Sequence, residues 1–168
     1  KIIGYSAFQN CTSLQQISIP SSVEEIGTTC FDCCTSLNQI TFGPNSILKK
    51  IGLKAFKNCS SLTEIHFPIH VDEIESHAFE NCSSLTEISI PSETAKIGEY
   101  TFIGCSALKH INIPKSLTEI GPLTFANCLS ITKIVIPQSI KNICESAFSE
   151  CLSLKKVEIL AQIKSIEN

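Results

Sequence analysis

The residues of this sequence that could do chemistry are its ten cysteines and four histidines. Cys30, Cys33 and Cys34 form a C-x-x-C-C cluster, a spacing that could serve a zinc site or a redox centre. No second pair of cysteines or histidines stands at zinc-binding spacing elsewhere in the chain. We therefore expect no metal site, no redox centre and no cofactor.

The histidines offer no catalytic set either. His66 and His110 are expected on one face of a sheet but two strands apart, about 10 Å, which is too far to share a metal ion. No nucleophile, general base and orienting group fall together in the sequence. The sequence predicts a protein that is not an enzyme.

These residues are spread out because the chain repeats one pattern about seven times. Phenylalanine recurs at intervals of 23, 25, 23, 23, 23 and 23 residues, and a cysteine follows each one at plus three. A fixed period between 20 and 50 residues is typical of a solenoid, in which each repeat is stabilised by its neighbours. The phenylalanines are Phe8, Phe31, Phe56, Phe79, Phe102, Phe125 and Phe148. The cysteines are Cys11, Cys34, Cys59, Cys82, Cys105, Cys128 and Cys151.

Within each repeat an L-x-x-I-x-I run is followed by a V-x-x-I run. The string I-P-x-S-V-x-x-I-G-x-x-A-F-x-x-C-x-S-L-x-x-I is nearly intact at Ile19 to Ile40 and at Ile90 to Ile111. It resembles the BspA-type leucine-rich repeat, of the 23-residue kind seen in TpLRR. The resemblance implies a right-handed leucine-rich repeat solenoid, mostly β with parallel strands and short turn or 3₁₀ segments. It also implies a surface protein that attaches to host or matrix proteins.

Some repeats depart from this pattern. Repeat two has two extra residues near Gly43 to Ser46, and Thr94 stands where valine is expected. Pro122 follows Gly121, and two glycines of the pattern are replaced by Glu75 and Cys144. We interpret these departures as loop variations. The insertion is open to two interpretations, a binding loop or neutral drift.

Strand alternation predicts which side chains of the L-x-x-I-x-I run point out of the sheet, onto the concave face. The first outward column changes from neutral through acidic to basic, and the second is small and polar in its middle. Either the repeats drift and only solubility matters, or this is a strip that binds a protein of opposite charge gradient. The candidate partner-binding residues are Gln16, Gln39, Glu64, His66, Glu87, His110, Asn112, Lys133 and Lys156.

The V-x-x-I run exposes a column in which charge signs alternate from Glu25 to Glu119. Opposite charges on adjacent strands form cross-strand pairs, so we interpret this column as structural. The repeat cysteines are expected to be buried thiols, with some disulfides as the alternative. Asn10, Asn58 and Asn81 match the N-x-[S/T] sequon, but asparagine is also favoured in such turns for its local hydrogen bonds.

Composition narrows the function further. The net charge is −3 and only two tyrosines and no tryptophan are present, which argues against a nucleic-acid partner. No apolar run approaches the roughly 18 to 20 residues of a membrane span. Residues 1–168 are expected to form a single leucine-rich repeat domain, cut from a longer array because both ends fall within a repeat.

The sequence thus predicts a non-enzymatic protein-interaction module, with a protein partner on the concave face. By resemblance it is a cell-surface adhesion or ligand-binding region. The alternative is an intracellular structural protein, cytoplasmic or cytoskeletal, whose solenoid is built into a larger assembly. Oligomeric state and the identity of the partner are left open by the sequence.

Overall fold

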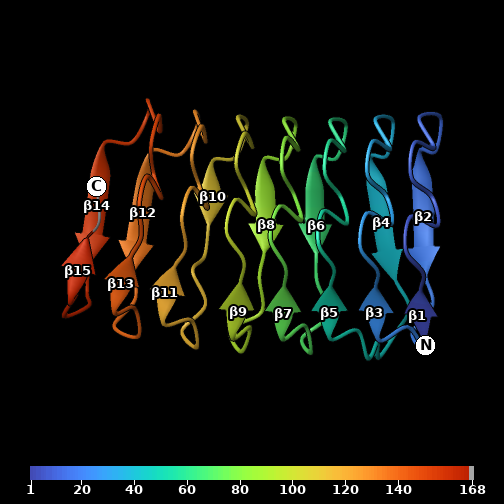
Figure 1. The fold of residues 1–168 in the computed structure, drawn as a ribbon, viewed down its shortest axis with the longest axis horizontal. Helices are drawn as coiled ribbons and strands as arrows, with labels where there is room; N and C mark the ends of the chain where they lie inside the picture. Colours follow the sequence, from blue (N-terminus) through green and yellow to red (C-terminus); the bar gives the residue numbers. More distant parts are fainter. Residues whose placement is uncertain (167–168) are drawn as a thin grey trace.

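In the computed structural model, which describes residues 1–166, the chain forms a solenoid of stacked coils (Figure 1). All strand pairs are parallel, and no helix occurs in the described part of the chain. We number the coils by their phenylalanines, so that coil 1 contains Phe8 and coil 7 contains Phe148. Glu167 and Asn168, the end of the expected domain, lie outside the described residues.

The even-numbered strands come from the L-x-x-I-x-I runs. Apart from the outward Val135, their apolar residues point inward and their polar residues outward, because successive side chains of a strand alternate between its two faces. We call the surface of these strands the even-strand face. Its strands are β2 (Gln16–Ile19), β4 (Gln39–Phe42), β6 (Glu64–His66), β8 (Glu87–Ser89), β10 (His110–Ile111), β12 (Lys133–Ile136) and β14 (Lys156–Ile159).

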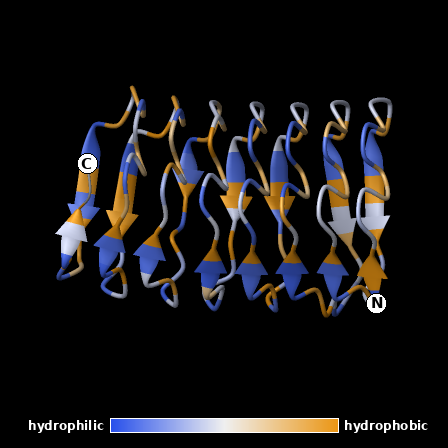
Figure 2. Ribbon diagram, viewed as in Figure 1, coloured by the Kyte–Doolittle hydropathy of each residue, from blue (hydrophilic) through white to orange (hydrophobic). Residues whose placement is uncertain are grey.

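The odd-numbered strands come from the V-x-x-I runs and are only two residues long. In most of them a hydrophilic residue is followed by a hydrophobic one, and the hydrophobic residue points inward (Figure 2). We call their surface the odd-strand face. Its strands are β1 (Ile2–Ile3), β3 (Glu25–Ile26), β5 (Lys50–Ile51), β7 (Glu73–Ile74), β9 (Lys96–Ile97), β11 (Glu119–Ile120), β13 (Asn142–Ile143) and β15 (Ser165–Ile166).

The repeat phenylalanines form one continuous stack through the interior. Neighbouring rings lie 5.2 to 5.7 Å apart between centroids, with interplanar angles of 2° to 12°. The five central rings are almost completely buried, whereas Phe8 and Phe148 at the ends are partly buried. Stacked rings stabilise the core beyond their buried area, so the stack joins all seven coils.

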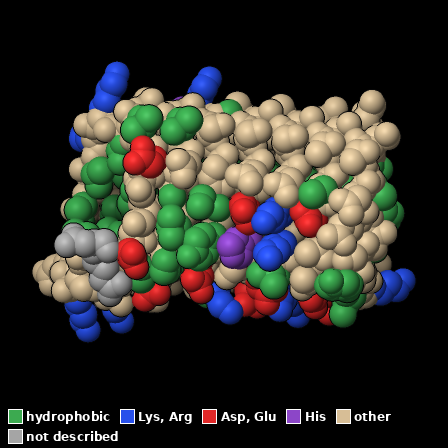
Figure 3. All heavy atoms as spheres, turned by 45° about the horizontal axis from the view of Figure 1, so that its top comes forward, with side chains coloured by type: hydrophobic (Ala, Val, Ile, Leu, Met, Phe, Trp, Pro, Cys, Tyr) green, Lys and Arg blue, Asp and Glu red, His purple; other side chains and the backbone are tan. Residues whose placement is uncertain are grey.

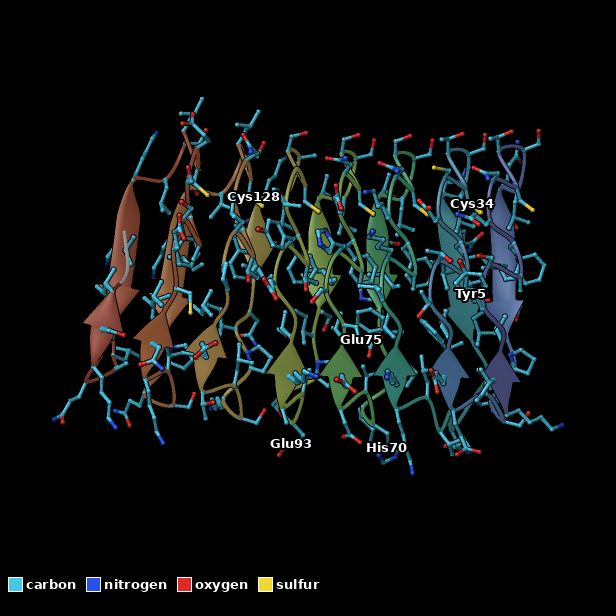
Figure 4. The ribbon with its side chains drawn as sticks, viewed as in Figure 1. Tyr5, Cys34, His70, Glu75, Glu93 and Cys128 are labelled. Carbon is cyan, nitrogen blue, oxygen red and sulfur yellow. The ribbon has the colours of Figure 1, made fainter. Side chains whose placement is uncertain are left out.

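The repeat cysteines pack beside this stack and bind the preceding coil. From Cys34 to Cys151, each thiol donates a hydrogen bond to the carbonyl of the phenylalanine one coil earlier, at Sγ–O distances of 3.1 to 3.3 Å. None of the ten cysteines forms a disulfide in the described chain. In Figure 4, Cys34 and Cys128 lie at the same level of coils far apart along the solenoid. The column is therefore structural. The prediction of buried thiols is confirmed for its five central members, Cys34 to Cys128, whereas Cys11 at the N-terminal end is exposed and Cys151 is partly buried.

Between the odd and even strands, each coil makes a tight turn segment around its phenylalanine. Two residues of each segment have positive φ, 50° to 74°, at the positions two before and two after the phenylalanine. Backbone N–H groups here donate to the next coil, for example Phe8 N to Cys30 O at 2.8 Å. Asparagine occupies four of the later positions because it tolerates this left-handed conformation better than most residues. These are Asn10, Asn58, Asn81 and Asn127.

The strand rows are interrupted, although the turn segments are not. The odd row divides between β9 and β11, and the even row divides between β4 and β6 and again between β10 and β12. The first gap in the even row follows the two-residue insertion of repeat two. The second coincides with the gap in the odd row, so coils 5 and 6 are unpaired on both strand faces.

Candidate protein-binding face

All nine residues that the sequence predicts as partner-binding are exposed on the even-strand face. We call this set the charged strip. Its first column is in register from strand to strand: Gln16 is opposite Gln39, Glu87 is opposite Glu64 and His110, and Lys133 is opposite Lys156. The structure therefore brings these residues together on one surface, as strand alternation predicts.

The steps in charge along the strip coincide with the gaps in the even row. Strands β2 and β4 carry the neutral glutamines, β6, β8 and β10 carry the two glutamates and His110, and β12 and β14 carry the two lysines. What the sequence predicts as one gradient is thus three blocks, each on its own small sheet. The segmentation itself was not predicted.

Two of these blocks place like charges directly opposite each other. Glu64 pairs in register with Glu87, and Lys133 with Lys156, on strands that lie about 4.8 Å apart. Like charges at such positions destabilise a sheet. Relief is partial: Glu158 lies 3.3 Å from the Lys133 ammonium and 3.7 Å from that of Lys156, and His66 Nε2 lies 3.7 Å from Glu64. The strip is therefore not arranged for stability alone.

An open pocket of about 590 Å³ lies where the first gap in the even row meets the insertion. Ile69 at its rim is 75% exposed, whereas serine stands at the same repeat position in coils 1 and 4. Sequence reasoning singled out the insertion but missed the pocket, for which an apolar residue at a normally polar turn position was the available signal. Its lining includes Thr41, Phe42, Asn45, His66, Phe67, Ile69 and His70.

The alternating charges of the odd-strand face form structural pairs, but only in part of the column. Glu73 Oε1 lies 2.5 Å from Lys96 Nζ, and Glu73 Oε2 lies 3.8 Å from Lys50 Nζ. The Lys96 hydrogen bond lowers the pKa of Glu73, and the same bond raises the pKa of Lys96. No ion pair within residues 1–166 joins Lys96 to Glu119, so the predicted cross-strand pairing of charges is interrupted between coils 5 and 6.

Glu75, which replaces a glycine of the repeat, links coils 3 and 4. Its carboxylate accepts a hydrogen bond from the Leu53 N–H at 2.7 Å and lies 2.7 Å from Lys50 Nζ. The hydrogen bond to Glu75 raises the pKa of Lys50. Figure 4 shows Glu75 near the strands of the odd row. This departure from the repeat therefore adds a contact across the junction between these coils.

The side chains singled out for chemistry are held by local contacts. Cys30 and Cys34 are buried, and Cys33 Sγ lies 3.4 Å from Asp32 Oδ1. Within the described residues, no group of three or more cysteine, histidine or acidic side chains could hold a metal ion. In the sequons, Asn81 donates to the Asn58 side chain at 3.2 Å, and Asn58 donates to Asp32 at 3.4 Å. These amides contribute to a side-chain ladder along the turns.

The turn segments form a second broad surface, shown in Figure 3. Charged side chains gather over its middle and N-terminal part, and hydrophobic side chains over its C-terminal half. Among the turn segments, Lys57 Nζ lies 3.1 Å from Glu80 Oε2, and the ring of Tyr100 stacks on His77 at 4.7 Å between centroids. None of the nine predicted binding residues lies on this surface. Residues 1–166 contain no helix of the length and apolarity required to cross a bilayer.

Comparisons with known proteins agree with the repeat geometry. The model of the BspA type leucine-rich repeat region matches residues 1–106 and 72–168, with six copies. A leucine-rich repeat protein from Bacteroides ovatus has a similar structure, with a TM-score of 0.92 and 31% identity over 99% of this chain and 43% of that one. The chain thus spans less than half the length of that protein. No curated protein matches significantly.

Two further solved structures are similar. The leucine-rich repeat protein of T. pallidum, TpLRR, has a TM-score of 0.85 and 31% identity over 90% of this chain and 72% of that one. A leucine-rich repeat protein from Eubacterium ventriosum has a TM-score of 0.68 and 22% identity over 87% of this chain and 49% of that one, which supports the fold alone. Since the family model covers the chain from end to end, the chain belongs to the BspA-type leucine-rich repeat family.

Proposed function

We propose that the chain is a non-enzymatic protein-recognition module whose charged strip binds the partner. The observation that carries this proposal is that two pairs of like charges are exposed and directly opposite each other on neighbouring strands. They are Glu64 with Glu87 and Lys133 with Lys156. A partner that presents basic groups to the glutamates and acidic groups to the lysines relieves both repulsions on binding. Complementary charges also orient and accelerate the encounter.

The pocket beside the strip offers an apolar contact in addition to the charged ones. Interfaces derive most of their binding energy from a few desolvated apolar or aromatic anchors. The exposed side chain of Ile69 and the partly buried Phe42 line a pocket between the neutral and acidic blocks of the strip. An apolar side chain of the partner would enter this pocket while its charged groups align with the glutamates and lysines.

We propose further that this recognition takes place at the cell surface, as the family resemblance implies, with a host or matrix protein as the partner. The test of location is to treat intact source cells with a membrane-impermeant amine reagent and recover peptides with modified lysines. Modified Lys133 and Lys156 from intact cells support the surface location. Modification only after lysis overturns it and favours a scaffold built into an intracellular assembly.

The test of the strip takes matrix proteins as the partner and therefore rests on the surface location. The double variant Lys133→Glu, Lys156→Glu is compared with Lys115→Glu, Lys141→Glu, which changes the net charge equally but outside the even strands. Binding to immobilised extracellular-matrix proteins is measured by surface plasmon resonance at low and high salt. We expect the strip variant to lose at least tenfold in affinity, and salt to weaken wild-type binding. Equal affinities of the two double variants would contradict the proposal.

A further inference from the structure

The junction between coils 5 and 6 forms a cleft on the odd-strand face, away from the charged strip. Within residues 1–166, β9 and β11 share no ladder, although every other neighbouring pair of odd strands does. Figure 1 shows these two strands farther apart than their neighbours in the same row. The coils stay joined by their turn segments, where Tyr100 N donates to Pro122 O at 3.0 Å and Phe102 N to Thr124 O at 2.9 Å.

Main-chain groups that pair at the adjacent junctions have no main-chain partner here. At the preceding junction Gly98 N donates to Ile74 O at 2.8 Å, and at the following one Cys144 N donates to Ile120 O at 2.9 Å. The equivalent groups, Gly121 N–H and Ile97 C=O, make no hydrogen bond in the described chain. The same holds for Thr118 N–H and Ala95 C=O. The two edges of the cleft therefore offer both donors and acceptors.

The spacing at the repeat glycine is wider at this junction than at two others. A Cβ added to Gly98 would meet the backbone nitrogen of Ser76 and lie 2.7 Å from its Cα, and one added to Gly52 would lie 2.7 Å from Thr28 N. A Cβ added to Gly121 would have no neighbour nearer than 3.5 Å, the distance to Thr124 Oγ1. The backbones therefore approach each other less closely at Gly121 than at Gly98 or Gly52, whereas the positions of Glu75 and Cys144 pair without a glycine.

The resulting cleft has a volume of about 590 Å³, within the range of ligand-binding pockets. Ile97, Leu117 and Pro122 supply apolar surface, and Glu99 and Glu119 lie at its rim. The one lysine in the lining, Lys96, is paired with Glu73. Glu119 accepts a hydrogen bond from Asn142 at 3.3 Å, which leaves its negative charge in place. The cleft is therefore acidic.

We propose that this cleft binds an extended peptide segment that carries a lysine or arginine. The segment lies across the mouth of the cleft and forms main-chain hydrogen bonds with its unpaired groups, such as Ala95 C=O and Thr118 N–H, as peptides do at exposed sheet edges elsewhere. Its basic side chain lies against Glu99 and Glu119, and its apolar side chains contact Leu117 and Pro122. This site is separate from the charged strip and does not depend on the strip's function.

The test uses the whole chain and four fluorescein-labelled octapeptides in which threonine and valine alternate and the fourth residue is arginine, lysine, glutamate or alanine. Fluorescence anisotropy should show saturable binding of the two basic peptides, at least tenfold tighter than of the glutamate peptide. An arginine peptide with N-methylated amides should bind at least tenfold more weakly than its parent. Equal binding of all peptides, or no binding, would overturn the proposal.

Variants locate the site. Gly121→Leu fills the cleft and should weaken the arginine peptide at least tenfold. The matched control is Gly4→Leu, at the same repeat position of coil 1, where nothing lies within 4 Å of an added Cβ; it should bind as wild type. Glu99→Lys, Glu119→Lys should reverse the preference between arginine and glutamate peptides. Circular dichroism verifies that each variant is folded. Binding that survives Gly121→Leu but is lost in Glu64→Lys, Glu87→Lys would assign the peptide to the strip and contradict the cleft.

Discussion

Coils 4 and 5 meet along both strand rows, whereas coils 5 and 6 meet only along their turns and their core. At the first junction β7 pairs with β9, and β8 with β10; at the second, neither row continues. Yet the phenylalanine stack passes through both junctions, with centroid distances of 5.7 Å for Phe79–Phe102 and 5.5 Å for Phe102–Phe125. A regular stack of interior side chains is therefore not sufficient to make the strands at the surface pair.

The sequences of the two junctions differ at small inward positions. Coils 3 and 4 have alanine before the phenylalanine, whereas coils 5 and 6 have Thr101 and Thr124. Their hydroxyls donate to the carbonyls of Gly98 and Gly121 at 2.5 and 2.8 Å. Ser116 Oγ lies 2.6 Å from Thr94 O across the open junction, and Thr94 Oγ1 lies 2.7 Å from Val71 O across the closed one. A side-chain hydrogen bond at this position is therefore common to both junctions and does not explain why only one of them lacks main-chain pairing.

The largest effect that tests this comparison is alkaline unfolding, because the thiol column crosses both junctions. Burial raises the pKa of Cys34 to about 11 and that of Cys105 to about 12, from 9.0. Above pH 9 the unfolded chain loses thiol protons that the folded chain keeps, so stability falls as pH rises, by about 1.4 kcal/mol per pH unit for each such thiol. We expect a single cooperative unfolding transition between about pH 9 and 12 by circular dichroism.

The control for this prediction is Cys105→Ala, which removes one buried thiol beside the open junction. The free energy of unfolding from urea titrations should then fall less steeply with pH, by the contribution of one thiol. Two separate alkaline transitions would mean that coils 1 to 5 and coils 6 to 7 unfold independently. That outcome would show that the core does not join the two sides of the open junction.

Next in size is removal of a ring on which both junctions depend. Phe102 is completely buried and stacks on both neighbours, so Phe102→Ala should destabilise the chain by about 3–5 kcal/mol. Phe8→Ala should cost less, because Phe8 is only partly buried and has a neighbouring ring on one side. Urea unfolding measures both. Equal losses would show that the stack does not distribute its energy as the geometry indicates.

Smaller, and most specific to the comparison, is a pair of glycine substitutions. Gly98→Ala forces the new Cβ against Ser76, and overpacking of this kind costs about 1–3 kcal/mol. Gly121→Ala adds a methyl group where there is room and should change stability by less than about 0.5 kcal/mol. Thermal unfolding of the two variants compares them directly. A loss at Gly121 as large as that at Gly98 would mean that the junction between coils 5 and 6 is closed in solution.

The interior was predictable from the sequence because burial repeats with the period of the chain. The seven phenylalanines, the cysteine column and the outward position of Lys133 or Glu64 follow from counting residues and from strand alternation. The breaks in the strand rows were not predictable in this way. Pro122 and Thr94 were interpreted as loop variations, because a departure at one position does not reveal how two adjacent backbones then approach each other.

The same limit applies to the charged strip and its pocket. Alternation assigns each strip residue to a face, but only the register shows that Glu64 is opposite Glu87, and only the backbone at the insertion shows a pocket beside Ile69. At Glu75, in contrast, the sequence suggests a disturbance that the structure does not have. A glutamate in place of glycine suggests a disturbed repeat, whereas its carboxylate binds two groups of coil 3 and strengthens a closed junction.

The smallest predicted effect concerns this contact. Glu75→Gln removes the charge opposite Lys50 but keeps an oxygen for the Leu53 N–H, so it should lower the free energy of unfolding by only about 0.2–1 kcal/mol, less at high salt. Glu75→Ala also leaves the Leu53 N–H without its acceptor and should cost about 1 kcal/mol more. Urea titration at two salt concentrations separates the two contributions. If both variants were as stable as wild type, main-chain pairing alone would close the junctions between coils. A side-chain contact like that of Glu75 would then not be expected to close the junction between coils 5 and 6.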